Sequence, residues 1–183
     1  DADRFVRNLD EFVIQWKPSD DFYLAVGKQK QKILSEYRGS SNALLVFERS
    51  ILTQNVLSQK LWGAAVGFKS PGLSHEIGVW GTAFEDDFAW PSFEDAGASF
   101  TYRASHELDE ATTLFFDYQH VDQDRSTPET FAGSPYENVF AVGTESKWGR
   151  FGLKTDVLFA LDRQDGRLSP GDDSHGFPVT PYY

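Results

Sequence analysis

Residues 61–83 read LWGAAVGFKSPGLSHEIGVWGTA, and their alternation indicates the fold class. From Leu61 to Lys69 the even positions are Trp, Ala, Val and Phe, whereas the odd positions include Gly63, Ala65 and Gly67. The turn-forming run Ser70–Gly72 follows, and a second alternating segment begins at Leu73. A period of two is the side-chain period of a β-strand, and Pro followed by Gly is typical of a turn. This part of the chain therefore predicts a β-hairpin with one bulky apolar face and one face of small residues.

Three more pairs of segments have the same two-residue period. They are predicted over 8–16 and 22–26, 98–104 and 112–119, and 138–146 and 151–161, with turns at 17–21, 105–111 and 147–150. The connections between pairs, over 28–60, 84–97, 120–137 and 162–176, are longer and polar. About eight antiparallel strands with short turns at one end and long loops at the other are typical of outer-membrane barrels. The sequence thus predicts an all-β, antiparallel, up-and-down transmembrane β-barrel.

Composition narrows the class of protein. The chain has 183 residues, a net charge of −11 and no Cys. One domain is expected at this length, and the acidic balance argues against nucleic-acid binding. The absence of Cys excludes disulfides and thiolate metal sites. The four His are scattered without ligand or triad spacing, so we expect no catalytic centre, metal or cofactor.

The two faces of the strands differ in chemistry. Aromatic residues concentrate beside the tight turns, as in the interfacial girdles of membrane barrels. The small residues opposite them, mixed with charges, suit a wall that borders water. A soluble sandwich or lipocalin-like barrel uses the same period with its apolar face turned inward, so this alternative stays open.

The long connection after the first hairpin carries the most specific motifs. They are the runs Leu24–Lys28, Leu34–Glu36, Ser40-Ser41 and Phe47–Ser50, preceded by Asp10–Pro18. In these runs the chain resembles the phosphate-selective porin O and P family of Gram-negative outer membranes. The resemblance is detailed over about residues 5–60 and rests on strand rhythm in the remainder.

The resemblance implies a homotrimer of barrels of about 16 strands, through which small anions or polar solutes diffuse. It also implies that the loop 28–60 folds into the lumen as a constriction. Since 183 residues supply about eight spanning strands, we expect residues 1–183 to be one incomplete porin domain. The expected surroundings are outer-membrane lipid.

The resemblance also assigns residues to the pore. Ser40, Ser41 and Arg49 match the family's constriction, where hydroxyls and guanidinium replace part of an anion's hydration shell. Phosphate-specialised members have a lysine directly after the glutamate of this motif. Here Tyr37 occupies that place and Arg38 is the nearest cation, which argues against phosphate specificity.

Four further basic residues are expected to face the lumen: Lys28, Lys30, Arg103 and Lys154. Simpler interpretations remain open for several of these residues. The two lysines also fit a solvated strand end, and Ser40-Ser41 also fits an ordinary turn. Arg49 also fits an ion pair with its neighbour Glu48.

Two other functions are compatible with the strand pattern. One is a soluble β-sandwich hydrolase acting on carbohydrate, with Glu76 and Asp117 as its carboxylate pair and Trp80 as a sugar platform. The other is an outer-membrane structural barrel that does not conduct. Weak anion selectivity that depends on Arg49 is the outcome expected for the porin.

Overall fold

The computed structural model describes residues 11–34, 60–81, 97–122, 134–163 and 173–182, which form ten β-strands in one sheet. The strands are β1 (Phe12–Ser19), β2 (Phe22–Gln29), β3 (Leu61–Ser70), β4 (Leu73–Gly81), β5 (Ala98–Glu107), β6 (Thr112–Asp122), β7 (Tyr136–Trp148), β8 (Phe151–Arg163), β9 (Ser174–Gly176) and β10 (Val179–Tyr182). From β1 to β8 each strand pairs antiparallel with the next, and both β9 and β10 pair with β8. The predicted all-β, antiparallel, up-and-down order is confirmed.

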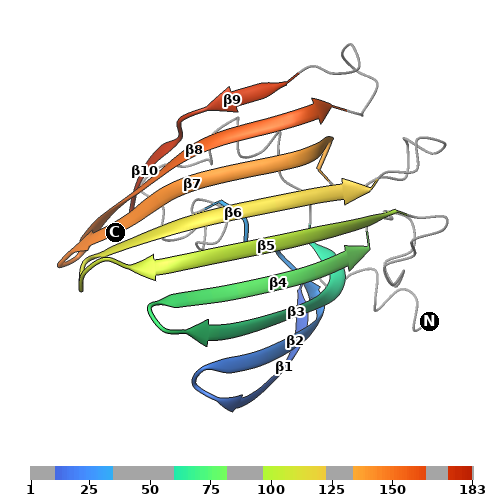
Figure 1. Cartoon of the computed structure of the whole chain (residues 1–183), viewed down its shortest axis with the longest axis horizontal. Helices are drawn as coiled ribbons and strands as arrows, with labels where there is room; N and C mark the ends of the chain where they lie inside the picture. Colours follow the sequence, from blue (N-terminus) through green and yellow to red (C-terminus); the bar gives the residue numbers. More distant parts are fainter. Residues whose placement is uncertain (1–10, 35–59, 82–96, 123–133, 164–172, 183) are drawn as a thin grey trace.

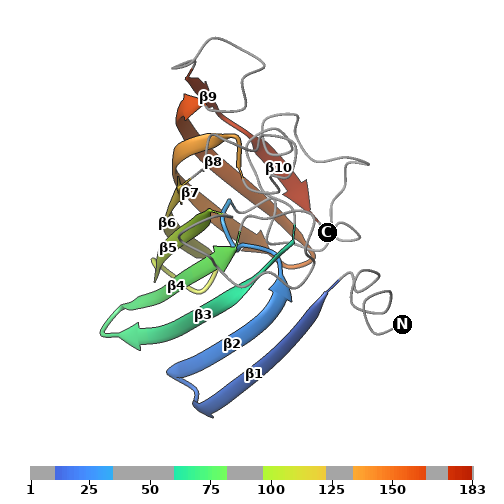
Figure 2. The same cartoon turned by 90° about the vertical axis from the view of Figure 1, so that its right-hand side faces the viewer.

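The sheet is open and curved. Figures 1 and 2 show the strands following one another around a trough, with β1 and β10 at its two ends. The blue segment that follows β2 lies on the inner side of the trough. We call this side of the sheet the concave face and the other side the convex face.

Bulky apolar side chains lie on the convex face. One row across the sheet runs through Val66, Ile77, Tyr102, Tyr118 and Phe140, and the rings of Tyr118 and Phe140 stack at 4.8 Å. Phe100, Phe116, Val157 and Phe159 on this face are 36% to 50% exposed. The apolar face is therefore turned outward, opposite to the arrangement in a soluble sandwich.

The concave face carries the small and polar residues. One row across it runs through Ala25, Ala65, Gly78, Thr101 and Gln119. These residues are buried. Neighbouring side chains cover them, since Trp80 lies against Gly78 and Gln31 accepts a hydrogen bond from Gln119.

The tight turns lie at one end of the sheet. The β3–β4 turn is Pro71-Gly72, and the β7–β8 turn is Gly149-Arg150, in which Gly149 has φ +62°. In the β1–β2 turn, Lys17 contacts Asp20 at 3.0 Å, and this hydrogen bond together with the lysine charge lowers the pKa of the Asp20 carboxyl. Strands β2, β3, β5, β6, β7 and β8 are longer than the periodicity predicts, and the turns that join β3 to β4, β5 to β6 and β7 to β8 are correspondingly shorter.

The bounds of the first turn differ from the sequence-based prediction for an identifiable reason. The turn expected at 17–21 is only two residues long, because β1 continues to Ser19 across a register shift that starts at Trp16. Pro18 lies in that irregular part, as expected for a residue without an amide hydrogen. Two short strands, β9 and β10, follow β8, and β9 lies within the connection predicted over 162–176.

Candidate functional site

The polar centre of the concave face is a row of side chains brought together by strand register. Tyr23, Gly67, Glu76, Arg103 and Asp117 are successive partners across β2 to β6. Their positions in sequence are far apart, but each antiparallel pairing places the next residue on the same face. The row is therefore a product of the register of five strands.

The chain leaving β2 crosses this row. We call residues Lys30–Leu34 the inner segment. The Gln31 amide donates to Ser99 Oγ at 3.1 Å, and its oxygen accepts from Gln119 at 2.7 Å. The Leu34 backbone N–H donates to Asp117 Oδ2 at 3.0 Å. Ile33 and Leu34 pack in a buried cluster with Tyr136, Val139, Ala141, Leu158 and Ala160.

The two carboxylates of the row each form an ion pair, and the pair between Lys32 and Glu76 is the more exposed to solvent. Lys32 Nζ lies 2.7 Å from Glu76 Oε2 and 3.2 Å from the Tyr23 hydroxyl. Tyr23 also donates to Glu76, so Glu76 Oε2 accepts hydrogen bonds from both the Lys32 ammonium and the Tyr23 hydroxyl. The Lys32 side chain is 44% exposed and the Glu76 side chain is 11% exposed. The ammonium therefore reaches the solvent side of the inner segment while its carboxylate partner stays in the wall.

Arg103 and Asp117 form the buried pair. Arg103 Nη1 lies 3.5 Å from Asp117 Oδ1 and donates to the Lys32 carbonyl at 3.3 Å. Its guanidinium also lies over the Phe115 ring, 4.8 Å from the centroid. The Asp117 side chain is fully buried. A buried charge is tolerated only when it is paired, and here the arginine supplies that charge.

A third ion pair lies on the concave face near the other edge of the sheet. Lys154 Nζ is 3.7 Å from Glu145 Oε1 and 4.9 Å from the centroid of the Tyr182 ring. Lys154 comes from β8, Glu145 from β7 and Tyr182 from β10. The pair therefore also joins the short last strand to the sheet.

The structure separates the four basic residues that were expected to face the lumen. Arg103 and Lys154 are on the concave face, each within an ion pair. Lys28 is on the convex face, where its neighbours across the strands are Phe12 and Trp62. Its position after Gly27 gives it the parity of the apolar row, which is why it does not join the other cations. Lys30 lies one residue beyond the end of β2.

The expected constriction residues Tyr37, Arg38, Ser40, Ser41 and Arg49 lie outside the described residues. The part of the loop 28–60 that is described, up to Leu34, does lie on the concave face. Sequence reasoning missed the roles of Gln31 and Gln119. The signal available was parity, since Gln119 shares the face of Thr101 and Gly78 in the predicted strands.

The carboxylates named for a hydrolase are on the same face but serve other partners. Asp117 accepts from the Leu34 backbone and pairs with Arg103, and it is buried below the inner segment. Glu76 is engaged by Lys32 and Tyr23. Both carboxylates are held by groups of the protein itself, whereas a general acid and its partner need direct access to the substrate.

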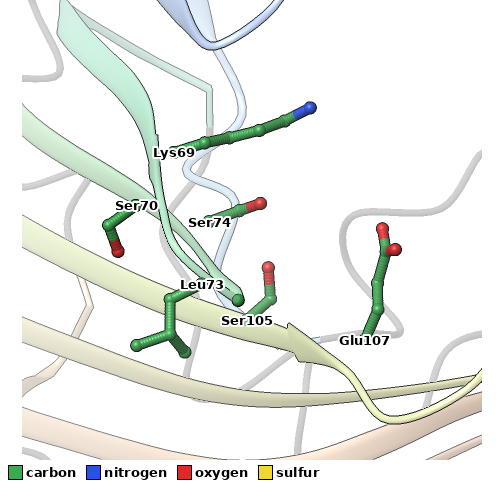
Figure 3. Close-up of a pocket in the computed structure, with 7 residues that line it drawn as sticks. Lys69, Ser70, Leu73, Ser74, Ser105 and Glu107 are labelled. Atoms are coloured by element: carbon green, nitrogen blue, oxygen red, sulfur yellow. The ribbon is translucent and has the colours of Figure 1, made fainter.

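A hollow of about 260 Å³ lies beside the β3–β4 turn. Its lining residues are Lys69, Ser70, Gly72, Leu73, Ser74, Ser105 and Glu107. Figure 3 shows Lys69, Ser74, Ser105 and Glu107 ending on one side of the hairpin. The hollow is thus a mixed-charge surface at the tight-turn end of the concave face.

Within the described ranges, no helix has the length and apolar character needed to cross a bilayer. Those ranges also contain no cluster of three or more His, Cys, Asp or Glu side chains arranged to hold a metal ion. No protein-family model matches the chain, and comparisons with curated proteins and with solved structures give no match either.

Proposed function

We propose that this chain forms part of the wall of an outer-membrane porin, through which small polar solutes and ions diffuse passively. The observation that carries the proposal is the inversion of the sheet. Its convex face is apolar and exposed, whereas its concave face holds charged groups and an inward-folded segment. This distribution of side chains suits a wall between lipid and an aqueous lumen.

The dimensions of the convex face support the proposal. On β8 the convex row runs from Phe151 to Leu161, which is about 33 Å along a strand and about 25 Å of height at the tilt usual for such barrels. The apolar band of outer-membrane barrels has about this height. Trp148 and Phe151 lie at the tight-turn end with exposed rings, as interfacial aromatics do.

The unpaired outer sides of the edge strands of the described sheet limit which assemblies can exist in a membrane. In a bilayer every backbone polar group needs a partner, so the outer sides of β1 and β10 must pair with further strands or with each other. A barrel of about 16 strands in a trimer, as in the porin O and P family, is the assembly we propose. The gel mobility and mass of the detergent-folded protein test this part.

Reconstitution tests the function directly. The chain, folded in detergent and added to a planar lipid bilayer, is expected to produce discrete steps of conductance. It is also expected to require detergent or lipid for solubility and to migrate differently on gels before and after heating. A stable monomer in detergent-free buffer would contradict the membrane location. Insertion without conductance would instead favour a structural barrel.

A further inference from the structure

The inner segment is held on the concave face by the apolar cluster with β7 and β8 and by polar side chains from four strands, the first of which is β2 with Tyr23. β4 contributes Glu76, β5 contributes Ser99 and Arg103, and β6 contributes Asp117 and Gln119. These groups bind both the backbone and the side chains of the segment. The contacts therefore fix the backbone path of the segment and also hold it against the sheet.

Local backbone structure alone does not hold the segment on this path. Its residues belong to no strand, and within it the Ile33 N–H donates to the Gln31 carbonyl at 2.9 Å to form a local turn. Leu34 has φ +61°, a conformation that residues other than glycine rarely adopt. Such a conformation persists only where surrounding contacts determine it.

We propose that Glu76 and Asp117 are positioning residues that clamp the inner segment to the wall, and that this clamp fixes where the segment lies beside the solute path. Glu76 acts on the Lys32 side chain. Asp117 acts on the Leu34 backbone directly and on the Lys32 carbonyl through Arg103. The effect on the solute path rests on the proposed porin function, whereas the clamp itself does not.

The clamp has two arms, the Lys32–Glu76 pair and the Arg103–Asp117 pair with its bonds to the segment. The two differ in the free energy needed to break them. Lys32 is half exposed, so solvent can replace its carboxylate partner at modest cost. Asp117 and Arg103 are buried, and separating them leaves an unpaired charge in a buried site. The Lys32–Glu76 arm is therefore the one to test by substitution, because its loss leaves the wall intact.

The absence of native cysteine makes a clean accessibility assay possible. A reporter thiol is introduced by Ile33→Cys, at a side chain that is 1% exposed. The detergent-folded full chain is then treated with a membrane-impermeant maleimide. In Glu76→Gln the labelling rate should rise about tenfold, since a hydrogen bond to a charged group is lost.

Three companion variants separate the clamp from a general effect. Lys32→Met removes the same pair from the exposed side and should raise the rate similarly, even if Glu76→Gln folds poorly. Lys32→Arg keeps the charge and should retain protection. Asp21→Asn removes a carboxylate 3.7 Å from Lys69 at the tight-turn end and should leave the rate unchanged.

Unchanged labelling in both Glu76→Gln and Lys32→Met would overturn the clamp, as would equal labelling in Lys32→Arg and Lys32→Met. Conductance gives the second readout. In planar bilayers Lys32→Met should alter single-channel conductance and increase its noise relative to Lys32→Arg. If the unmodified chain does not conduct while the labelling pattern holds, the porin function fails and the clamp stands.

Discussion

Gly67 lies between Tyr23 and Glu76 on the concave face, and its lack of a side chain lets the tyrosine ring reach the carboxylate. A Cβ at this position would lie 2.0 Å from Tyr23 Cε1. The ring covers the glycine and places its hydroxyl against Glu76. Aromatic cover of a glycine on a neighbouring strand is a known way of fixing register in sheets.

Gly67→Ala should therefore destabilise the fold by about 2 kcal/mol, the usual cost of overpacking. The ring must move, and its hydrogen bond to Glu76 is lost as it does. Urea unfolding of the detergent-folded protein, followed by tryptophan fluorescence, measures the change. Gly149→Asn is the control, because nothing lies within 4 Å of that site and asparagine tolerates its positive φ. Equal stability of the two variants would contradict the packing argument.

The buried and exposed ion pairs should respond differently to loss of a carboxylate charge. Asp117→Asn leaves Arg103 without its buried counter-charge and should cost about 3 kcal/mol in the free energy of unfolding. Asp21→Asn removes an exposed pair and should cost less than about 1 kcal/mol. The same urea titration compares them. A small effect at Asp117 would mean that the guanidinium has a solvent route that its burial does not reveal.

At the scale of single strands, β7 separates the membrane and soluble interpretations. Val142 is on the convex face between Phe116 and Val157, and it is 49% exposed. In lipid, Val142→Lys should cost about 3 kcal/mol, whereas an exposed site in water would tolerate lysine within about 0.5 kcal/mol. The fraction of chain that folds into lipid vesicles, measured by protease protection, reports the difference.

Glu110→Lys is the matched control for that variant. It places a lysine in the β5–β6 turn, at an exposed position beyond the apolar rows. Folding into vesicles should be unaffected, because the turn lies outside the proposed hydrocarbon layer. If Val142→Lys inserts as well as Glu110→Lys does, the convex face does not contact lipid.

At the scale of the whole molecule, charge predicts ion preference. Among the described residues, the middle of the concave face carries Glu76, Asp117, Glu145 and Asp156 against Lys32, Arg103 and Lys154. Three of those carboxylates are partners of the three cations in the ion pairs already described. The chain as a whole has a charge of −11. These charges do not support the anion preference that the family resemblance implies.

We therefore expect a pore formed by this chain to pass potassium more readily than chloride. Fixed charges lining a lumen enrich counter-ions and so set the sign of selectivity. The zero-current potential in a potassium chloride gradient measures it. Glu145→Gln should shift that potential toward chloride, since Lys154 then loses its counter-charge. Chloride preference in the unmodified protein would contradict this expectation.

The sequence predicted the elements well because the governing signals are local. Alternation over 61–69 and 73–81 gives both strands of the hairpin and their faces, and Pro71-Gly72 gives the turn. Errors occurred at strand ends. The predicted β1–β2 turn begins too early, because residues 17–19 continue the strand through an irregular register that accommodates Pro18.

The concave site was only partly predictable. The sequence predicted lumen-facing cations at Arg103 and Lys154, and it offered Glu76 and Asp117 as a hydrolase pair. It did not predict which of these charges pair with one another. Lys28 was assigned to the wrong face because it was grouped with its neighbouring lysines, while strand parity places it with Phe12 and Trp62. The parity rule was sufficient to place Lys28 correctly.

The amino-acid sequence by itself determined the strands, their order and the chemistry of their two faces, because a period of two and the turn residues act between near neighbours. Only the tertiary structure decided which charges meet. Lys32 and Glu76 are 44 residues apart, and Leu34 and Asp117 are 83 apart. Such contacts depend on the register of several strands, on the curvature of the sheet and on the path of the inner segment. None of these is set by any short run of residues.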